Sequence, residues 1–128
     1  MAVLPDNNGV GALHATFAID YDGVAYPLLE YDVGAPVWLS PDGYIRRGDE
    51  DGTCERLLGR FESASGSVAT VQICGVARFN IVGGFSDEPK CGDKVLVKRD
   101  HVIRSKKKRA SGFVIAVDMK NNTCDVLL

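Results

Sequence analysis

The carboxyl-terminal two-thirds of the chain contains an internal repeat. Residues 34–46 return 58 positions later, without a gap, as residues 92–104. Five of the thirteen positions are identical, and the agreement continues on both sides of this stretch. Self-similarity of this kind indicates a duplicated supersecondary unit, which limits the folds open to the chain. We therefore expect two β-modules, over about residues 23–73 and 75–128.

Turn signals divide the chain into short segments. Its 128 residues include 14 glycines and 5 prolines, and Gly or Asp-Gly turns recur about every ten residues. This pattern favours strands over helices and predicts an all-β fold, a small β-barrel or β-sandwich domain over 16–128. Residues 1–15 are small and aperiodic, which predicts an extended N-terminal arm. The expected strands are 16–19, 24–29, 37–39, 44–46, 57–61, 68–73, 76–82, 94–97, 102–104, 113–117 and 124–128.

Glycines recur at matching places in the two modules. Gly34 and Gly92 stand shortly before a strand, and Gly59 and Gly112 open a later one. A glycine at such a place lets the backbone bend or bulge where a side chain would clash. We expect all four glycines to serve the fold rather than a ligand.

No arrangement of reactive side chains points to catalysis. The four cysteines are 20, 17 and 33 residues apart, without the close pairs that zinc sites use, and are expected to be reduced and mostly buried. Nucleophile and phosphate-binding motifs are missing from the sequence. We therefore expect no enzyme activity, no metal and no cofactor. The single tryptophan, Trp38, lies in an apolar strand and is a candidate core or subunit-interface anchor.

Charge is divided unevenly along the chain although the net charge is only -2. Residues 1–57 hold ten acids and three bases, and residues 58–128 hold seven acids and twelve bases. Equivalent connections of the two modules differ in sign, which suits copies of the chain packed head to tail. The candidate contact residues are Asp49, Glu50 and Asp51 in the first module and Lys106, Lys107, Lys108 and Arg109 in the second.

The sequence predicts no contact with a membrane. It holds no apolar run near the roughly 20 residues that a membrane span requires. Its first residues lack the basic region and apolar core of a signal peptide, so we expect a soluble protein made in the cytoplasm.

The second module resembles a known family. It runs from Gly75-Val76-Ala77 through a Gly-x-x-Val-x-Val hairpin at 92–97 and Gly-Phe-Val-Ile-Ala-Val at 112–117 to a last strand at 125–128. This order resembles the head decoration, or capsid cement, proteins of tailed bacteriophages, and residues 57–73 resemble the same ending placed mid-chain. The resemblance implies a small β-rich protein that binds the outside of an expanded capsid at symmetry axes and reinforces it.

This resemblance also implies the partners. They would be the major capsid protein and other copies of the chain, as a trimer or a dimer, on the exterior of a virion made in the host cytoplasm. An extended arm can add a strand to the edge of a neighbouring sheet. Val3, Leu4, Pro5 and Val10 are the candidate arm contacts with the capsid, and the acidic and basic loops are further candidates.

Two other functions compete with this one. A small nucleic-acid-binding β-barrel could use the basic segment 94–109, including Lys98, Arg99 and Arg104, and its affinity would fall steeply with salt. The segment lacks interleaved aromatic residues and the pI is about 5.6, so nucleic-acid binding is not our expectation. A phage tail or baseplate protein would share the β-repeat but would assemble into rings or tubes.

Overall fold

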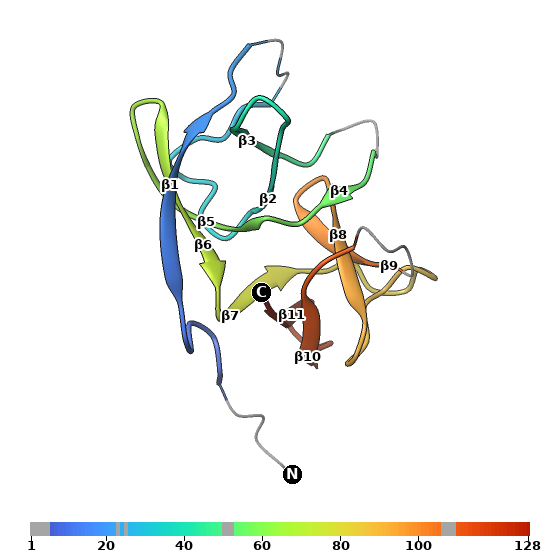
Figure 1. Cartoon of the computed structure of the whole chain (residues 1–128). Coiled ribbons are helices and arrows are strands. Elements are labelled where there is room, and N and C mark those ends of the chain that lie inside the picture. The colour runs from blue at the N-terminus through green and yellow to red at the C-terminus, as the bar shows by residue number, and fades with distance from the viewer. Residues whose placement is uncertain (1–5, 23, 25, 50–52, 106–109) are drawn as a thin grey trace.

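The computed structural model describes residues 6–22, 24, 26–49, 53–105 and 110–128. The fold is all-β, and no helix occurs among the described residues, so none of them forms a helix that could cross a membrane. Figure 1 shows the strands gathered into two β-units, which follow one another along the chain except that β4 lies beside β8 of the second unit. The strands are β1 Leu13–Ile19, β2 Pro36–Leu39, β3 Tyr44–Arg47, β4 Glu55–Arg56, β5 Gly59–Ser65, β6 Val68–Cys74, β7 Val76–Asn80, β8 Lys94–Lys98, β9 His101–Ser105, β10 Phe113–Asp118 and β11 Thr123–Leu127.

The first unit is a closed five-stranded barrel with the strand order β1-β3-β2-β5-β6. All its strand pairs are antiparallel except β1 with β3, which is parallel. Every second side chain of a strand points inward, and the inward set forms one apolar core. The buried members of this core are Ile19, Leu28, Val37, Ile45, Phe61, Ala69 and Val71.

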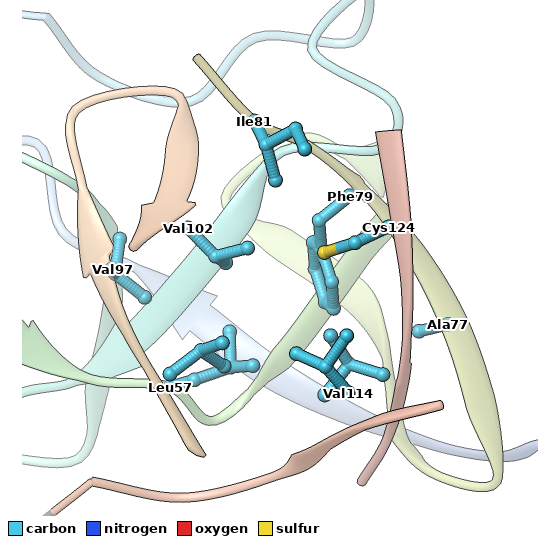
Figure 2. Close-up of a cluster of buried hydrophobic side chains, with 10 residues drawn as sticks. Leu57, Ala77, Phe79, Ile81, Val97, Val102, Val114 and Cys124 are labelled. Atoms are coloured by element: carbon cyan, nitrogen blue, oxygen red, sulfur yellow. The ribbon is translucent and has the colours of Figure 1, made fainter. Parts of the chain in front are cut away.

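The second unit consists of two three-stranded sheets, β10-β11-β7 and β4-β8-β9. A bridge between Val95 and Ser111 joins β8 to the segment just before β10. Side chains from both sheets meet in a second apolar core, and Figure 2 shows Val97 and Val102 of the β8–β9 hairpin facing Phe79, Val114 and Cys124. Each unit therefore has a core of its own.

The two units share one pairing scheme. The Gly34 N–H donates to the Phe61 carbonyl at 2.8 Å, and the Gly92 N–H donates to the Val114 carbonyl at 2.8 Å. The β5–β6 and β10–β11 pairs carry bulges at matching places, just after Phe61 and Val114. On this basis β1, β2, β3, β5 and β6 correspond to β7, β8, β9, β10 and β11. Closure differs, because the parallel pairing of β1 with β3 has no hydrogen-bonded equivalent between β7 and β9.

The predicted repeat differs from the structure at its edges. Leu39 pairs with Ile45, whereas Val97 pairs with Val102, so the second hairpin is one residue shorter and the ungapped alignment slips there. The first strand of the first unit is β1, and the predicted boundary at residue 23 therefore lies too late. Residues 24 and 26–29 form no strand: Leu28 is buried in the first core while the segment carrying it is irregular.

Gly34 and Gly92 hold equivalent backbone conformations, with φ of 93° and 92°. These values lie in the left-handed region, where a residue with a Cβ is strained. The expected role of both glycines in the fold is therefore supported by their backbones.

The predicted N-terminal arm is shorter than residues 1–15. Leu13 already belongs to β1, and the chain before it lies along β7. The Gly9 N–H donates to the Val76 carbonyl at 2.8 Å, and the Val76 N–H donates to the Val10 carbonyl at 2.9 Å. Asp6 forms an ion pair with Arg78 at 3.0 Å. The described part of the arm is therefore attached to the protein's own sheet.

Candidate functional site

The structure describes only part of the predicted contact residues. Val3, Leu4, Pro5, Glu50, Asp51, Lys106, Lys107, Lys108 and Arg109 lie outside the described residues. Val10 is 57% exposed, but its carbonyl is bound to Val76 of the same chain. Asp49 is half-buried, next to Gly48, whose N–H donates to the Arg99 carbonyl at 3.1 Å. The contacts expected of the acidic and the basic loop therefore stay predictions.

Trp38 lies at the junction of the two units. It belongs to β2 of the first unit, but its ring packs against the core of the second. Its indole N–H donates to the Arg47 carbonyl at 2.9 Å, and the Arg46 guanidinium lies 5.7 Å from the ring centroid. Trp38 is thus anchored within the chain.

Arg60 and Gln72 also connect the two units. Arg60 of β5 donates from Nε to the Arg78 carbonyl of β7 at 3.1 Å. The buried Gln72 amide donates to the carbonyls of Cys74 and Val76 at 3.1 and 3.0 Å. Since buried polar groups are costly unless they are bonded, these contacts fix the sharp passage from β6 to β7.

Two of the described bases in the basic segment are bound to neighbouring protein groups. Lys98 pairs with Asp87 at 3.8 Å, and Arg104 donates to the Ser86 carbonyl at 2.6 Å. Both side chains contact the loop that follows β7. Both cations already have a partner within the protein, which does not favour phosphate binding by either of them.

The cysteines differ in their surroundings. All four are free thiols: Cys124 is buried, Cys54 and Cys74 are half-buried, and Cys91 is exposed. Burial, with smaller effects of Asp125 and Cys91, raises the pKa of Cys124 to about 12. No three His, Cys, Asp or Glu side chains among the described residues are grouped to hold a metal.

A tyrosine-rich surface was not singled out by the sequence analysis. All four tyrosines of the chain fall within residues 20–45, together with five acids and no base. The structure exposes every one of these rings, between 43% for Tyr21 and 76% for Tyr31. Tyrosines elsewhere in proteins are commonly half-buried, so four exposed rings in one stretch are unusual. The clustering of tyrosines and acids in one base-free stretch was the sequence signal that could have revealed this surface.

Tyr21 lies at the centre of this surface and borders two shallow hollows. One, of about 250 Å³, also contains Tyr31, Leu29 and Glu30 in its lining. The other, of about 380 Å³, is lined by Asp20, Asp22, Asp42 and Tyr44 besides Tyr21 and Ile19. The Tyr21 hydroxyl donates to the Gly66 carbonyl in the β5–β6 turn at 3.2 Å, which holds the ring between the hollows. We call these hollows and their rims the tyrosine face.

The acids of the tyrosine face fall into two groups. Asp20 pairs with Arg46 at 3.1 Å, and Asp32 pairs with Arg47 at 3.5 Å. Asp22, Glu30 and Asp42 are exposed and have no cationic partner among the described residues. These three carboxylates give the face a negative potential.

Comparisons with known proteins identify no relative of this chain. No family model matches it, and no curated protein or solved structure gives a significant match.

Proposed function

We propose that the protein is a structural decoration protein of a phage capsid, which binds the outer surface of the shell and reinforces it. The sequence resemblance of the second module suggests this role, and the tyrosine face is the observation that carries it here. A protein that cements a shell needs broad, shallow contacts. Tyrosine is enriched at such contacts because its rigid ring buries a large area and its hydroxyl can still donate a hydrogen bond.

The placement of this face suits the role. Figure 1 shows the β2–β3 and β5–β6 turns at the end of the first barrel that points away from the second unit and from the C-terminus. An end-on contact through the tyrosine face would leave the second unit free to meet a neighbouring copy. Many identical contacts on one particle add up to strong retention even when each is weak. The oligomer in this proposal is a trimer or a dimer on the virion exterior.

The segment that we propose as a capsid-binding arm is shorter than residues 1–15. Because Gly9 and Val10 already pair with Val76, they are not free to add a strand to another sheet. Deleting residues 1–15 would remove part of β1 and damage the first barrel. Deleting residues 1–5 keeps every described contact. If these residues form the arm, we expect this variant to fold normally and to bind capsids less well.

Cosedimentation with purified capsids tests the function. The protein is mixed with expanded, undecorated capsids of several tailed phages and with their unexpanded precursors, and bound particles are imaged by electron cryomicroscopy. We expect ordered density on the outside of an expanded shell and a higher melting temperature of the decorated particle. Absence of decoration on every capsid, together with DNA retention that falls steeply with salt, would instead support the nucleic-acid-binding alternative.

A further inference from the structure

We propose that the tyrosine face is a docking surface for a lysine- or arginine-bearing segment of a partner protein. This inference concerns the chemistry of the partner, and it rests on the proposed function only in taking that partner to be a shell subunit. The argument depends on the shape of the face, the chemistry of its rings and the sign of its charge.

The shape favours an extended segment that lies across the face. The two hollows share Tyr21 as a common wall, so a chain that crosses it could place one side chain in each. Tyr31 lines one hollow and Tyr44 lines the other, so each hollow has a second ring besides Tyr21. Tyr21 is already held by Gly66, and a ring fixed in advance loses little conformational freedom when a partner binds.

The rings favour a cation with an aliphatic stem. Exposed tyrosine faces attract guanidinium and ammonium groups, and the attraction is larger for arginine because its planar head can stack on the ring. Leu29 is 40% exposed beside Tyr31 and offers an apolar surface to the methylenes of such a side chain. The hollows therefore suit both parts of a lysine or arginine.

The charge selects the same partner. Asp22 and Asp42 lie in the Tyr44 hollow and Glu30 lies in the Tyr31 hollow, so each hollow offers a carboxylate without a cationic partner among the described residues. A basic segment would neutralise them, and acidic or phosphate-bearing partners would be repelled. This is the opposite preference to that of the basic segment 94–109, which makes the two surfaces separable in one experiment.

A titration followed by NMR tests the proposal on the full chain. The ¹⁵N-labelled protein is titrated with a hexa-arginine peptide and, in parallel, with hexaglutamate. We expect hexa-arginine to shift the amides of residues 20–45 and of the β5–β6 turn, and hexaglutamate to leave them unchanged. Because no capsid is used, failure of the capsid experiment would not affect this result, and failure here would not by itself exclude capsid binding by another surface.

Variants separate the contributions of rings and charges. The double variant Tyr21→Ser, Tyr31→Ser should bind hexa-arginine about five-fold more weakly or worse, since two ring contacts are lost. The triple variant Asp22→Asn, Glu30→Gln, Asp42→Asn keeps the shape of the face and should lose most of the binding at low salt. The matched control is Phe85→Ser, which removes an aromatic ring that is 65% exposed on the second unit and should change the affinity less than two-fold.

The outcomes are distinct. Shifts confined to the second unit, equal binding of hexaglutamate at the tyrosine face, or equal losses in Phe85→Ser and the tyrosine variants would overturn the proposal. The amide spectrum of each variant shows whether it is folded. If the tyrosine variant does not fold, the triple charge variant decides the question, because its side chains are exposed and nearly isosteric with the originals.

Discussion

Replacing Gly59 by alanine should destabilise the first barrel through a steric clash rather than through backbone strain. Gly59 opens β5, and a Cβ added there would lie 1.9 Å from the Gln72 carbonyl oxygen of β6. Ordinary contacts of this kind begin at 3.4 Å, so the two strands would have to separate by about 1.5 Å, the difference between these distances. Gly59 does not have a positive φ, and the cost is therefore steric.

The size of the effect follows from what the strands would lose. The neighbouring pairs Arg60 with Gln72 and Phe61 with Val71 hold β5 to β6, and each ladder hydrogen bond contributes about 0.5–1.5 kcal/mol net. Separation would also loosen the packing of Phe61 and Val71, which are fully buried, and forced overpacking alone costs about 1–3 kcal/mol. We expect Gly59→Ala to lower the free energy of unfolding by about 3 kcal/mol or more, a large part of the roughly 5–15 kcal/mol of a typical domain.

Urea denaturation followed by the fluorescence of Trp38, the single tryptophan, measures this loss. The matched control is Gly66→Ala in the β5–β6 turn, where φ is 63° and nothing lies within 4 Å of the added Cβ. That variant carries backbone strain of about 1–2 kcal/mol without a collision. A Gly59→Ala protein as stable as Gly66→Ala, or within 1 kcal/mol of the parent, would refute the reasoning.

Three further predictions follow from the same contacts. Trp38→Phe keeps most of the packing at the junction but loses the hydrogen bond to the Arg47 carbonyl. Urea unfolding followed by circular dichroism, since this variant has no tryptophan, should show a loss of about 0.5–1.5 kcal/mol, and an unchanged midpoint would contradict this assignment. The hydrogen bond from the Asn8 N–H, and then the charge of Arg78, lower the pKa of Asp6. The charged form therefore stabilises the fold above the ordinary pKa of Asp, and this stabilisation is lost as pH falls through the lowered pKa. Asp6→Asn should make the melting temperature less dependent on pH at the acid end of a thermal-melt profile. Burial raises the pKa of Cys124 from 9.0 to about 12, so stability should fall as pH rises from 9 towards 12, and Ellman's reagent at pH 8 should modify the exposed Cys91 long before Cys124.

The hairpins were predictable from the sequence because local signals and tertiary structure agree there. Pro41-Asp42-Gly43 sets a turn between β2 and β3, and the structure gives Gly43 a φ of 87°. The short apolar run of β8 is buried on both faces, with Val95 and Val97 in the second core and Leu96 packed in a smaller cluster with Ile103 and Ala110. In both places the chain's own pattern fixes the strand without help from a distant partner.

The start of β1 was not predictable in this way. The segment from Leu13 to Ala15 has a weak pattern, and it becomes strand because the seven-residue β6 pairs along its whole length. A trace of the duplication is visible, since Ala15-Thr16-Phe17 matches Ala77-Arg78-Phe79. The two phenylalanines occupy equivalent positions in the structure. Phe17 pairs with Ala69 of β6, and Phe79 pairs with Cys124 at the corresponding point of β11. The connection after β1 is longer than the connection after β7, so this match has a different sequence offset from the match of residues 34–46 with 92–104. An ungapped comparison therefore does not detect both.

Loop length also explains where the two units differ in their surfaces. The connection from the first to the second strand runs over residues 20–35 in the first unit and 81–93 in the second. In the first unit it carries Tyr21, Tyr26 and Tyr31 and no base, whereas in the second it carries Phe85 and Lys90 in a mixed-charge loop. Leu28 of the first connection is buried in the core of the barrel, whereas its three tyrosines are exposed and do not fill that core. A variant that replaces Tyr21, Tyr26 and Tyr31 by serine and keeps Leu28 should therefore remain β-structured while losing affinity for a basic peptide, which would separate the requirements of the fold from those of the proposed contact.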